Sequence, residues 1–263
     1  MSTPVPPATD SNPFRAPAAR VAEPGTWSSS ELLDQPRQIE AGSPLRWLST
    51  GWTMFKEAPG PWVGMFLGYF AIMLVLGALP IIGILNNVLS SVLAGGLMLA
   101  AQGQAHGRRP AAGQLFDGFK KNTGGLALLG VLYLCAALAI ALVAGVGVLG
   151  AIGAMAAGGS DFTPVGGVGI ALFVLLGVIL LMPLSLAAMW APALVAIHDL
   201  QAVAALKLAL TACVRNWMAL VVFVLIGIAL TVPIVLTLGL AALAIGPTVF
   251  IALWAGYRDV FVR

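Results

Sequence analysis

The chain has 263 residues, of which 60% are apolar and 9% are charged, and its mean hydropathy is +0.99. Soluble domains contain about 45–50% apolar and about 25% charged residues, so this composition excludes a water-soluble globular protein. The net charge of +3 comes from scattered Lys and Arg residues that never form runs longer than two, which argues against a nucleic-acid partner. The composition predicts a polytopic membrane protein whose partners are membrane lipids.

Residues 1–42 are rich in Pro and Ala, carry both charge signs and have no apolar period. Such a segment cannot bury enough surface to offset the entropy lost on ordering. We therefore expect a disordered cytoplasmic tail over residues 1–42, followed by a membrane domain over residues 43–263. The tail has two candidate roles, a plain flexible extension or a docking peptide for a protein partner.

Ordered structure is expected to begin at Ser43 and Pro44, a residue pair typical of a helix start. The apolar residues that follow recur at spacings of three, four and three, on one helix face: Leu45, Leu48, Trp52 and Phe55. At about 14 residues this helix is shorter than the roughly 20 that a bilayer requires. It is predicted to lie in the membrane interface.

Long charge-free intervals locate the spans. Residues 58–107, 122–160, 162–198 and 216–257 contain no Asp, Glu, Lys or Arg. Turn-forming residues divide these intervals into six predicted spans: 61–81, 84–105, 124–157, 165–197, 217–237 and 240–258.

Basic residues lie at one side of these spans. The open ends of the three predicted hairpins hold Arg46, Lys56, Arg108, Arg109, Lys120, Lys121, Lys207, Arg215, Arg258 and Arg263. The three hairpin tips hold no Lys or Arg. Because basic residues collect on the cytoplasmic side, both termini are expected in the cytoplasm.

A short amphipathic segment that ends in a basic residue precedes each hairpin: Leu45–Lys56, Ala112–Lys121 and Gln201–Arg215. The predicted fold class is therefore all-α, a polytopic bundle of six transmembrane helices arranged as three hairpins, each preceded by a short amphipathic interfacial helix. Internal triplication and convergent membrane patterning explain this regularity equally well.

A set of motif residues is spread over the second half of the chain: Trp190, Pro192, His198, Asp199, Arg215, Asn216, Trp217, Tyr257, Arg258 and Asp259. With these residues the chain resembles a family of bacterial inner-membrane proteins known only as hypothetical transmembrane proteins of Gram-negative bacteria. The resemblance covers residues 45–263, implies location in the inner membrane and supplies no substrate. More distantly, the layout is similar to the membrane domain fused to some glycerophosphodiester phosphodiesterases, whose activity is not expected without their catalytic domain.

Chemistry-bearing residues are scarce in the predicted spans. Ionisable residues mark proton relays and ion paths in membranes, and their absence from the span interiors argues against a proton pump or an intramembrane metalloprotease. Ser90, Ser91 and Ser185 have no neighbouring base to activate them, so they are expected to bond to their own helices. We predict no enzyme activity, no catalytic residue, no metal and no cofactor.

Several polar residues near the span ends have structural explanations. Asp199 is predicted to cap the helix that starts near Gln201, although His198, Asp199 and His106 together are an alternative metal site. Gln102 and Gln104 are expected to be satisfied by water or by partner helices. The pair Asn86-Asn87 is predicted to form the first hairpin turn, and Cys135 and Cys213 to act as apolar fillers.

Small residues and prolines indicate how the spans pack. Gly64 and Gly68 form a GxxxG face, which serves internal packing or, alternatively, homodimerisation. Prolines inside spans four to six favour kinked helices: Pro183, Pro192, Pro233 and Pro247.

Three functions follow from these patterns. The leading hypothesis is a non-catalytic structural or accessory membrane module, which contacts protein partners through its tail or its interfacial helices. The alternative is a carrier or lipid-handling protein with a groove among spans four to six, and an enzyme is the third. A polar-lined cavity would favour the carrier, and a closed bundle would favour the accessory module.

Overall fold

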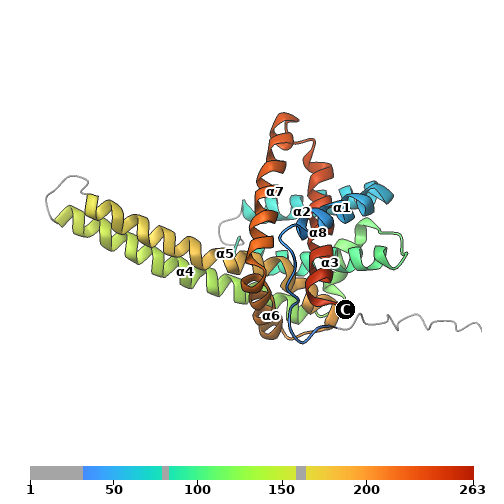
Figure 1. Cartoon of the computed structure of the whole chain (residues 1–263), viewed down its shortest axis with the longest axis horizontal. Coiled ribbons are helices and arrows are strands. Elements are labelled where there is room, and N and C mark those ends of the chain that lie inside the picture. Colours follow the sequence, from blue (N-terminus) through green and yellow to red (C-terminus); the bar gives the residue numbers. More distant parts are fainter. Residues whose placement is uncertain (1–31, 79–82, 158–163) are drawn as a thin grey trace, which may run out of the picture. The chain divides into compact units, whose positions relative to one another are not determined.

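The computed structural model describes residues 32–78, 83–157 and 164–263 (Figure 1). The chain divides into two units, Met1–Ser30 and Glu31–Arg263, and every described residue belongs to the second. In chain order its elements are α1 (Ser43–Glu57), α2 (Pro59–Gly77), α3 (Gly83–Ala105), the 3-10 helix η1 (Ala112–Phe119), α4 (Thr123–Ala157), α5 (Pro164–His198), α6 (Ala202–Arg215), α7 (Trp217–Leu236) and α8 (Ala242–Phe261).

The described part of the chain is all-α, as predicted, and its only extended pairing is an isolated bridge between Leu32 and Val262. Five of its helices are long and apolar enough to cross a membrane: α2, α3, α4, α5 and α7. The helix α8, whose sequence includes Arg258 and Asp259 near its end, is not among these five.

The helices α4 and α5 form an antiparallel pair and lie side by side (Figure 1). Each has 35 residues and is therefore about 52 Å long, which exceeds the roughly 30 Å hydrocarbon core. Large apolar side chains such as Leu142 and Leu149 are exposed along this pair. Helices that are apolar on all sides in this way suit contact with lipid tails.

Two details of the predicted hairpins differ in the structure. Asn86 and Asn87 lie inside α3, so the prediction that they form the first turn is wrong; apolar residues at Leu85 and Leu89 continue the helical spacing through them. The helices α7 and α8 follow one another in the chain, but α8 packs chiefly on α1, α2, α3 and α5. The tip of the second hairpin, residues 158–163, lies outside the described residues.

The three amphipathic elements occupy equivalent places. Each packs on the second helix of a predicted hairpin: η1 on α3, α6 on α5, and α1 on α8. The first two contacts join neighbours in the chain, whereas the third joins the first described helix to the last. The same packing relation thus occurs three times in the described part of the chain.

The contacts of these elements are close because small residues lie in them. A Cβ on Gly51 of α1 would lie 2.4 Å from the carbonyl oxygen of Thr248 in α8. In α6, the buried face consists of Ala202, Ala205, Ala209, Ala212 and Cys213. Gly64 and Gly68 of α2 face Ala112 and Leu115 of η1, so their GxxxG face serves internal packing.

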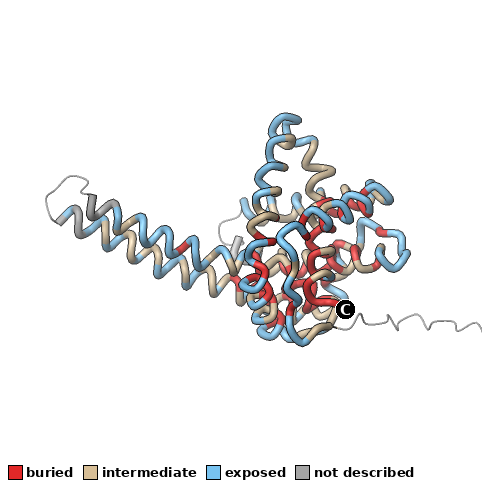
Figure 2. Tube along the Cα trace, viewed as in Figure 1, coloured by how far each residue is buried: buried red, intermediate tan, exposed pale blue. Residues whose placement is uncertain are grey.

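Four buried tryptophans lie in the core, and each donates its indole N–H to a helix other than its own. Trp47 donates to Asp259 Oδ2 at 3.0 Å and Trp190 to the carbonyl oxygen of Leu253 at 3.2 Å. Paired in this way, the rings carry no unsatisfied polar atom into the core. Figure 2 shows that buried residues gather where the helices meet and are sparse along most of the α4–α5 pair. They are densest in α3, in the C-terminal part of α5 and in α8.

The amides Gln102 and Gln104 satisfy the other two tryptophans. Gln102 Oε1 accepts from Trp254 Nε1 at 2.9 Å, and Gln104 Oε1 accepts from Trp62 Nε1 at 2.7 Å. Gln104 Nε2 also donates to the carbonyl oxygen of Met54 at 2.8 Å. The prediction that partner helices satisfy these glutamines is confirmed.

Residues 32–42 pack on the C-terminal helix, although the sequence expectation places them in the disordered tail. The amide of Leu33 donates to the carbonyl oxygen of Phe261, and that of Arg37 donates to Val260, both at 2.8 Å. Pro36 is buried, and Leu32 and Ile39 pack against the core. The remainder of the expected tail, residues 1–31, lies outside the described residues.

Candidate functional site

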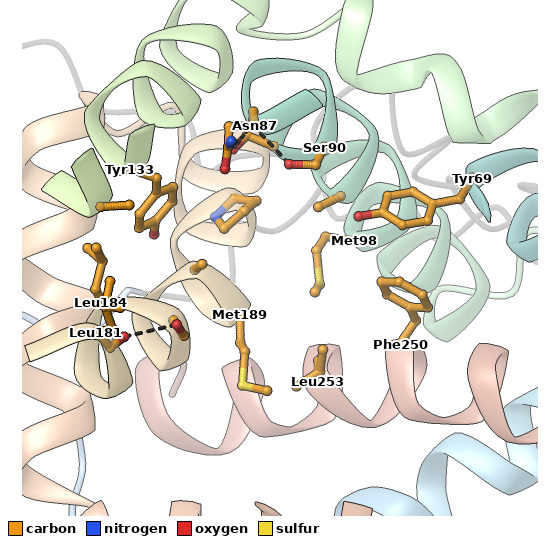
Figure 3. A pocket seen from close by; sticks show the side chains of 16 residues that line it. Tyr69, Asn87, Ser90, Met98, Tyr133, Leu181, Leu184, Met189, Phe250 and Leu253 are labelled. Carbon is orange, nitrogen blue, oxygen red and sulfur yellow. Dashed lines mark hydrogen bonds between the residues drawn. The ribbon is translucent and has the colours of Figure 1, made fainter. Parts of the chain in front are cut away.

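A pocket of about 340 Å³ lies between α2, α3, α4, α5 and α8 (Figure 3). Tyr69 and Phe250 lie at one side of it, and Tyr133, Leu181 and Leu184 lie at the other. This volume is at the lower end of the range for small-molecule sites. Most of the wall is apolar.

The polar part of the pocket wall is uncharged. Among the residues that the structure describes, none of those lining the pocket is Asp, Glu, Lys, Arg or His. The polar side chains among them are Tyr69, Asn87, Ser90, Ser91, Tyr133 and Ser185. The pocket is therefore suited to a ligand that is mainly apolar and carries an uncharged hydrogen-bonding group.

Tyr133 on α4 is the unusual member of this set. Its side chain is only 8% exposed, and among the described residues its hydroxyl has no hydrogen-bond partner. The hydroxyl points to the side of the pocket where Leu181 and Leu184 lie (Figure 3). Burying a polar group without a hydrogen-bond partner costs about 1–3 kcal/mol of stability. A ligand that accepts a hydrogen bond from this hydroxyl would remove that cost, which would strengthen its binding.

The pocket serines donate to their own helices. Ser90 Oγ donates to the carbonyl oxygen of Asn87 at 2.9 Å, and Ser185 Oγ donates to that of Leu181 at 2.9 Å. Ser91 Oγ donates to Asn87 as well, at 3.3 Å. The prediction of bonding within the helix is confirmed, and each serine keeps lone pairs that can accept from a ligand.

The pocket does not coincide with the predicted groove among spans four to six. Pro192 and other residues of α5, and Phe250 and Leu253 of α8, do line it, but α7 contributes no lining residue. Its remaining wall comes from α2, α3 and α4. The sequence analysis did not identify Tyr69 or Tyr133 as site residues. The signal that could have found them is that tyrosines are rare polar groups in otherwise apolar spans.

The motif residues are spread over several places and do not form one site. Trp190 is fully buried in the core, and Pro192 lines the pocket. His198 Nε2 is hydrogen-bonded to the hydroxyl of Tyr257 on α8, which joins the end of α5 to the end of the chain. Arg258 stacks over Trp254, with its Cζ 5.1 Å from the ring centroid.

Asn216 joins α6 and α7 to the segment before α1. Its Nδ2 donates to the carbonyl oxygen of Arg37 at 3.0 Å, and its Oδ1 accepts from the amide of Ile39 at 2.9 Å. The neighbouring residues Arg215 and Trp217 are exposed. The site of Asn216 is therefore a structural clamp between segments far apart in the sequence.

The predicted role of Asp199 is wrong. The N-cap position of α6 is Gln201, and no side chain caps this helix. Asp199 instead has a φ of 54°, the left-handed conformation that commonly ends a helix. Asp adopts this conformation more readily than most residues with a side chain, which explains its place directly after α5.

Changes at Asp199 should accordingly follow backbone preference. We expect Asp199→Gly to be neutral or to stabilise slightly, and Asp199→Val to cost about 1–2 kcal/mol of unfolding free energy. Thermal unfolding of the purified protein in detergent measures both. If Asp199→Gly were as harmful as Asp199→Val, the side chain rather than the backbone would matter.

Metal-binding residues do not gather in the part of the chain that the structure describes: no three His, Cys, Asp or Glu side chains could hold an ion together. Cys213 packs in the core, where burial raises the pKa of its thiol to about 12. Cys135 is exposed on α4.

These helices and their exposed apolar surfaces define a multi-pass integral membrane protein. The chain is similar to a probable inner membrane protein of Burkholderia thailandensis, with 29% identity over 217 residues, covering 78% of this chain and 79% of the relative. No family model matches the chain, and no solved structure matches it. The similarity and the apolar helices together support location in the bacterial inner membrane.

Proposed function

We propose that this protein is a non-catalytic accessory of the inner membrane that binds a lipid-like amphiphile in the pocket between α2, α3, α4, α5 and α8. The observation that carries the proposal is the buried hydroxyl of Tyr133, which has no partner among the described residues and faces an uncharged, mainly apolar pocket. The proposal therefore combines the accessory role, which was the leading hypothesis from the sequence, with the lipid-handling role, which was the alternative.

The chemistry of the pocket selects the ligand class. An ester carbonyl can accept from Tyr133, and a hydroxyl can donate to Ser90 or Ser185, whose own protons are engaged in the helix. A charged headgroup would lose its hydration without an opposite charge in the wall. The ligand we propose therefore has acyl chains and a neutral polar group, as diacylglycerol does.

A photoactivatable diacylglycerol with a diazirine in one acyl chain tests the proposal. The full chain in nanodiscs should be labelled on α3 and α5 peptides that line the pocket. Ala94→Phe should abolish this labelling because the ring fills the pocket, and Tyr133→Phe should reduce it about fivefold through loss of one hydrogen bond. Peptide mass spectrometry gives the sites.

Ala141→Phe is the matched control, because Ala141 lies on the exposed surface of α4 and does not line the pocket. It should leave pocket labelling unchanged. Labelling that is equal in wild-type and Ala94→Phe, or that spreads evenly over α4, α5 and α7, would contradict binding in the pocket.

The proposal includes a topology of six spans as three hairpins, with α8 as the sixth span and both termini in the cytoplasm. The ten basic residues at the open hairpin ends support it. Single cysteines at Gly113 and Ser160 in a cysteine-free background provide the test. An impermeant maleimide should label position 160 but not 113 in intact spheroplasts; the reverse result would invert the orientation.

A further inference from the structure

A second pocket, also of about 340 Å³, lies where α1, α8 and the segment before α1 meet. Unlike the first, it is strongly basic. Four of its lining residues are arginines: Arg37, Arg46, Arg258 and Arg263. The acidic side chain in its lining is Asp259.

Asp259 and Glu40 offset one of these charges. The Arg46 guanidinium lies 3.9 Å from Asp259 Oδ2 and 3.5 Å from Glu40 Oε2. Asp259 Oδ2 is also held by the indole N–H of Trp47. The Asp259 carboxylate is thus already engaged by Arg46 and Trp47.

Arg37 and Arg258 are not offset in this way. Over residues 32–78, 83–157 and 164–263, neither guanidinium forms an ion pair with Asp or Glu. Arg258 instead lies over the face of Trp254, which holds its guanidinium in place. Arg37 is fixed at its backbone by the amide of Asn216. Arg37 and Arg258 therefore both line the pocket, and among the described residues neither is paired with a carboxylate.

The surroundings of the pocket favour an anion close to an apolar surface. The first turn of α1, which holds Arg46 and Trp47, carries no acidic residue and adds the positive end of the helix dipole. On the same helix Leu45 is 61% exposed and Trp52 is 45% exposed. These side chains can enter the membrane interface beside the pocket.

We propose that this basic pocket binds a phosphate group between Arg37 and Arg258. Guanidinium groups bind phosphate oxygens through two parallel hydrogen bonds, and basic pockets between membrane helices hold the headgroups of anionic lipids. The phosphate is carried by an anionic phospholipid or by a soluble phosphate, and both sources use the same two arginines.

The test is thermal unfolding of the delipidated full chain in dodecyl maltoside with three probes: dioctanoylphosphatidylglycerol, dioctanoylphosphatidylcholine and inorganic phosphate. We expect phosphatidylglycerol to bind about tenfold more tightly than phosphatidylcholine, with a preference that falls as sodium chloride is raised. Stabilisation by phosphatidylglycerol alone identifies the lipid headgroup, and equal stabilisation by inorganic phosphate identifies a soluble anion.

The double variant Arg37→Gln/Arg258→Gln should lose the preference for phosphatidylglycerol over phosphatidylcholine. It should keep the melting temperature of the unliganded protein, because both side chains are exposed. Lys56→Gln/Lys207→Gln removes the same charge from exposed positions outside the pocket and should keep the preference. Equal loss in both double variants would overturn the site. So would a wild-type chain that binds neither anionic probe, or one whose binding is insensitive to salt.

Discussion

Replacing Gly118 by alanine is expected to destabilise the protein more than any other glycine-to-alanine change. A Cβ at this position of η1 would lie 2.0 Å from the carbonyl oxygen of Val92 in α3. Because that neighbour is backbone, it cannot rotate away, and η1 must separate from α3. Overpacking of this kind costs about 1–3 kcal/mol or more. Gly96→Ala, whose Cβ would lie 2.2 Å from the carbonyl oxygen of Leu115, should act in the same way.

Gly113→Ala in the same 3-10 helix is the control, because a Cβ there meets nothing within 4 Å. It should change the unfolding free energy by less than about 0.5 kcal/mol. Thermal unfolding in detergent, followed by circular dichroism, measures all three variants. A Gly118→Ala protein that melts with wild-type would show that η1 and α3 are not in backbone contact.

The second large effect concerns the segment before α1. Deletion of residues 2–42 should lower the melting temperature strongly, whereas deletion of residues 2–31 should leave the packing of residues 32–42 in place and change little. The longer deletion removes buried Pro36 and two of the three partners of the Asn216 side chain, the amide of Ile39 and the carbonyl oxygen of Arg37; the carbonyl oxygen of Ala212 remains. An unsatisfied buried amide alone costs about 1–3 kcal/mol.

Asn216→Ala separates the clamp from the rest of the segment. In the full chain it should cost about 1–3 kcal/mol, and in the chain lacking residues 2–42 it should cost less, because only the bond to the carbonyl oxygen of Ala212 is left to lose. Such non-additivity is the expected sign of direct contact. Equal costs in both backgrounds, or equal melting of the two deletions, would show that residues 32–42 do not pack on this clamp.

Hydropathy and charge located most of the helices, because lipid exposure leaves apolar runs that are interrupted only at their ends. The same method failed where local composition is a poor guide to packing. Residues 32–42 resemble the proline-rich tail, yet Leu32 and Ile39 pack against the core. The helix α8 has two charges in its last turn, and one of them, Asp259, is part of the contact with Trp47.

The candidate site could be predicted only in fragments. The bonding of Ser90 and Ser185 within their helices follows from the sequence, because a serine in an apolar helix has its own carbonyls as the nearest acceptors. The pocket does not follow, because it requires five helices to meet. Tyr133 is informative only when its surroundings show that its hydroxyl lacks a partner.

The packing of α1 on α8 sets the order in which the protein can be completed. The hydrogen bond from Trp47 to Asp259 joins residues 212 positions apart. At a synthesis rate of about 5–20 residues per second, the first amphipathic helix waits roughly 10–40 seconds for its partner. During that time the part of α1 that packs on α8 is left to the membrane surface or a chaperone, although Trp47 can already contact Trp190 of α5 and, later, Phe223 of α7. Stalled or truncated chains that lack α8 would expose this part of α1 permanently, which would mark them for membrane quality-control proteases.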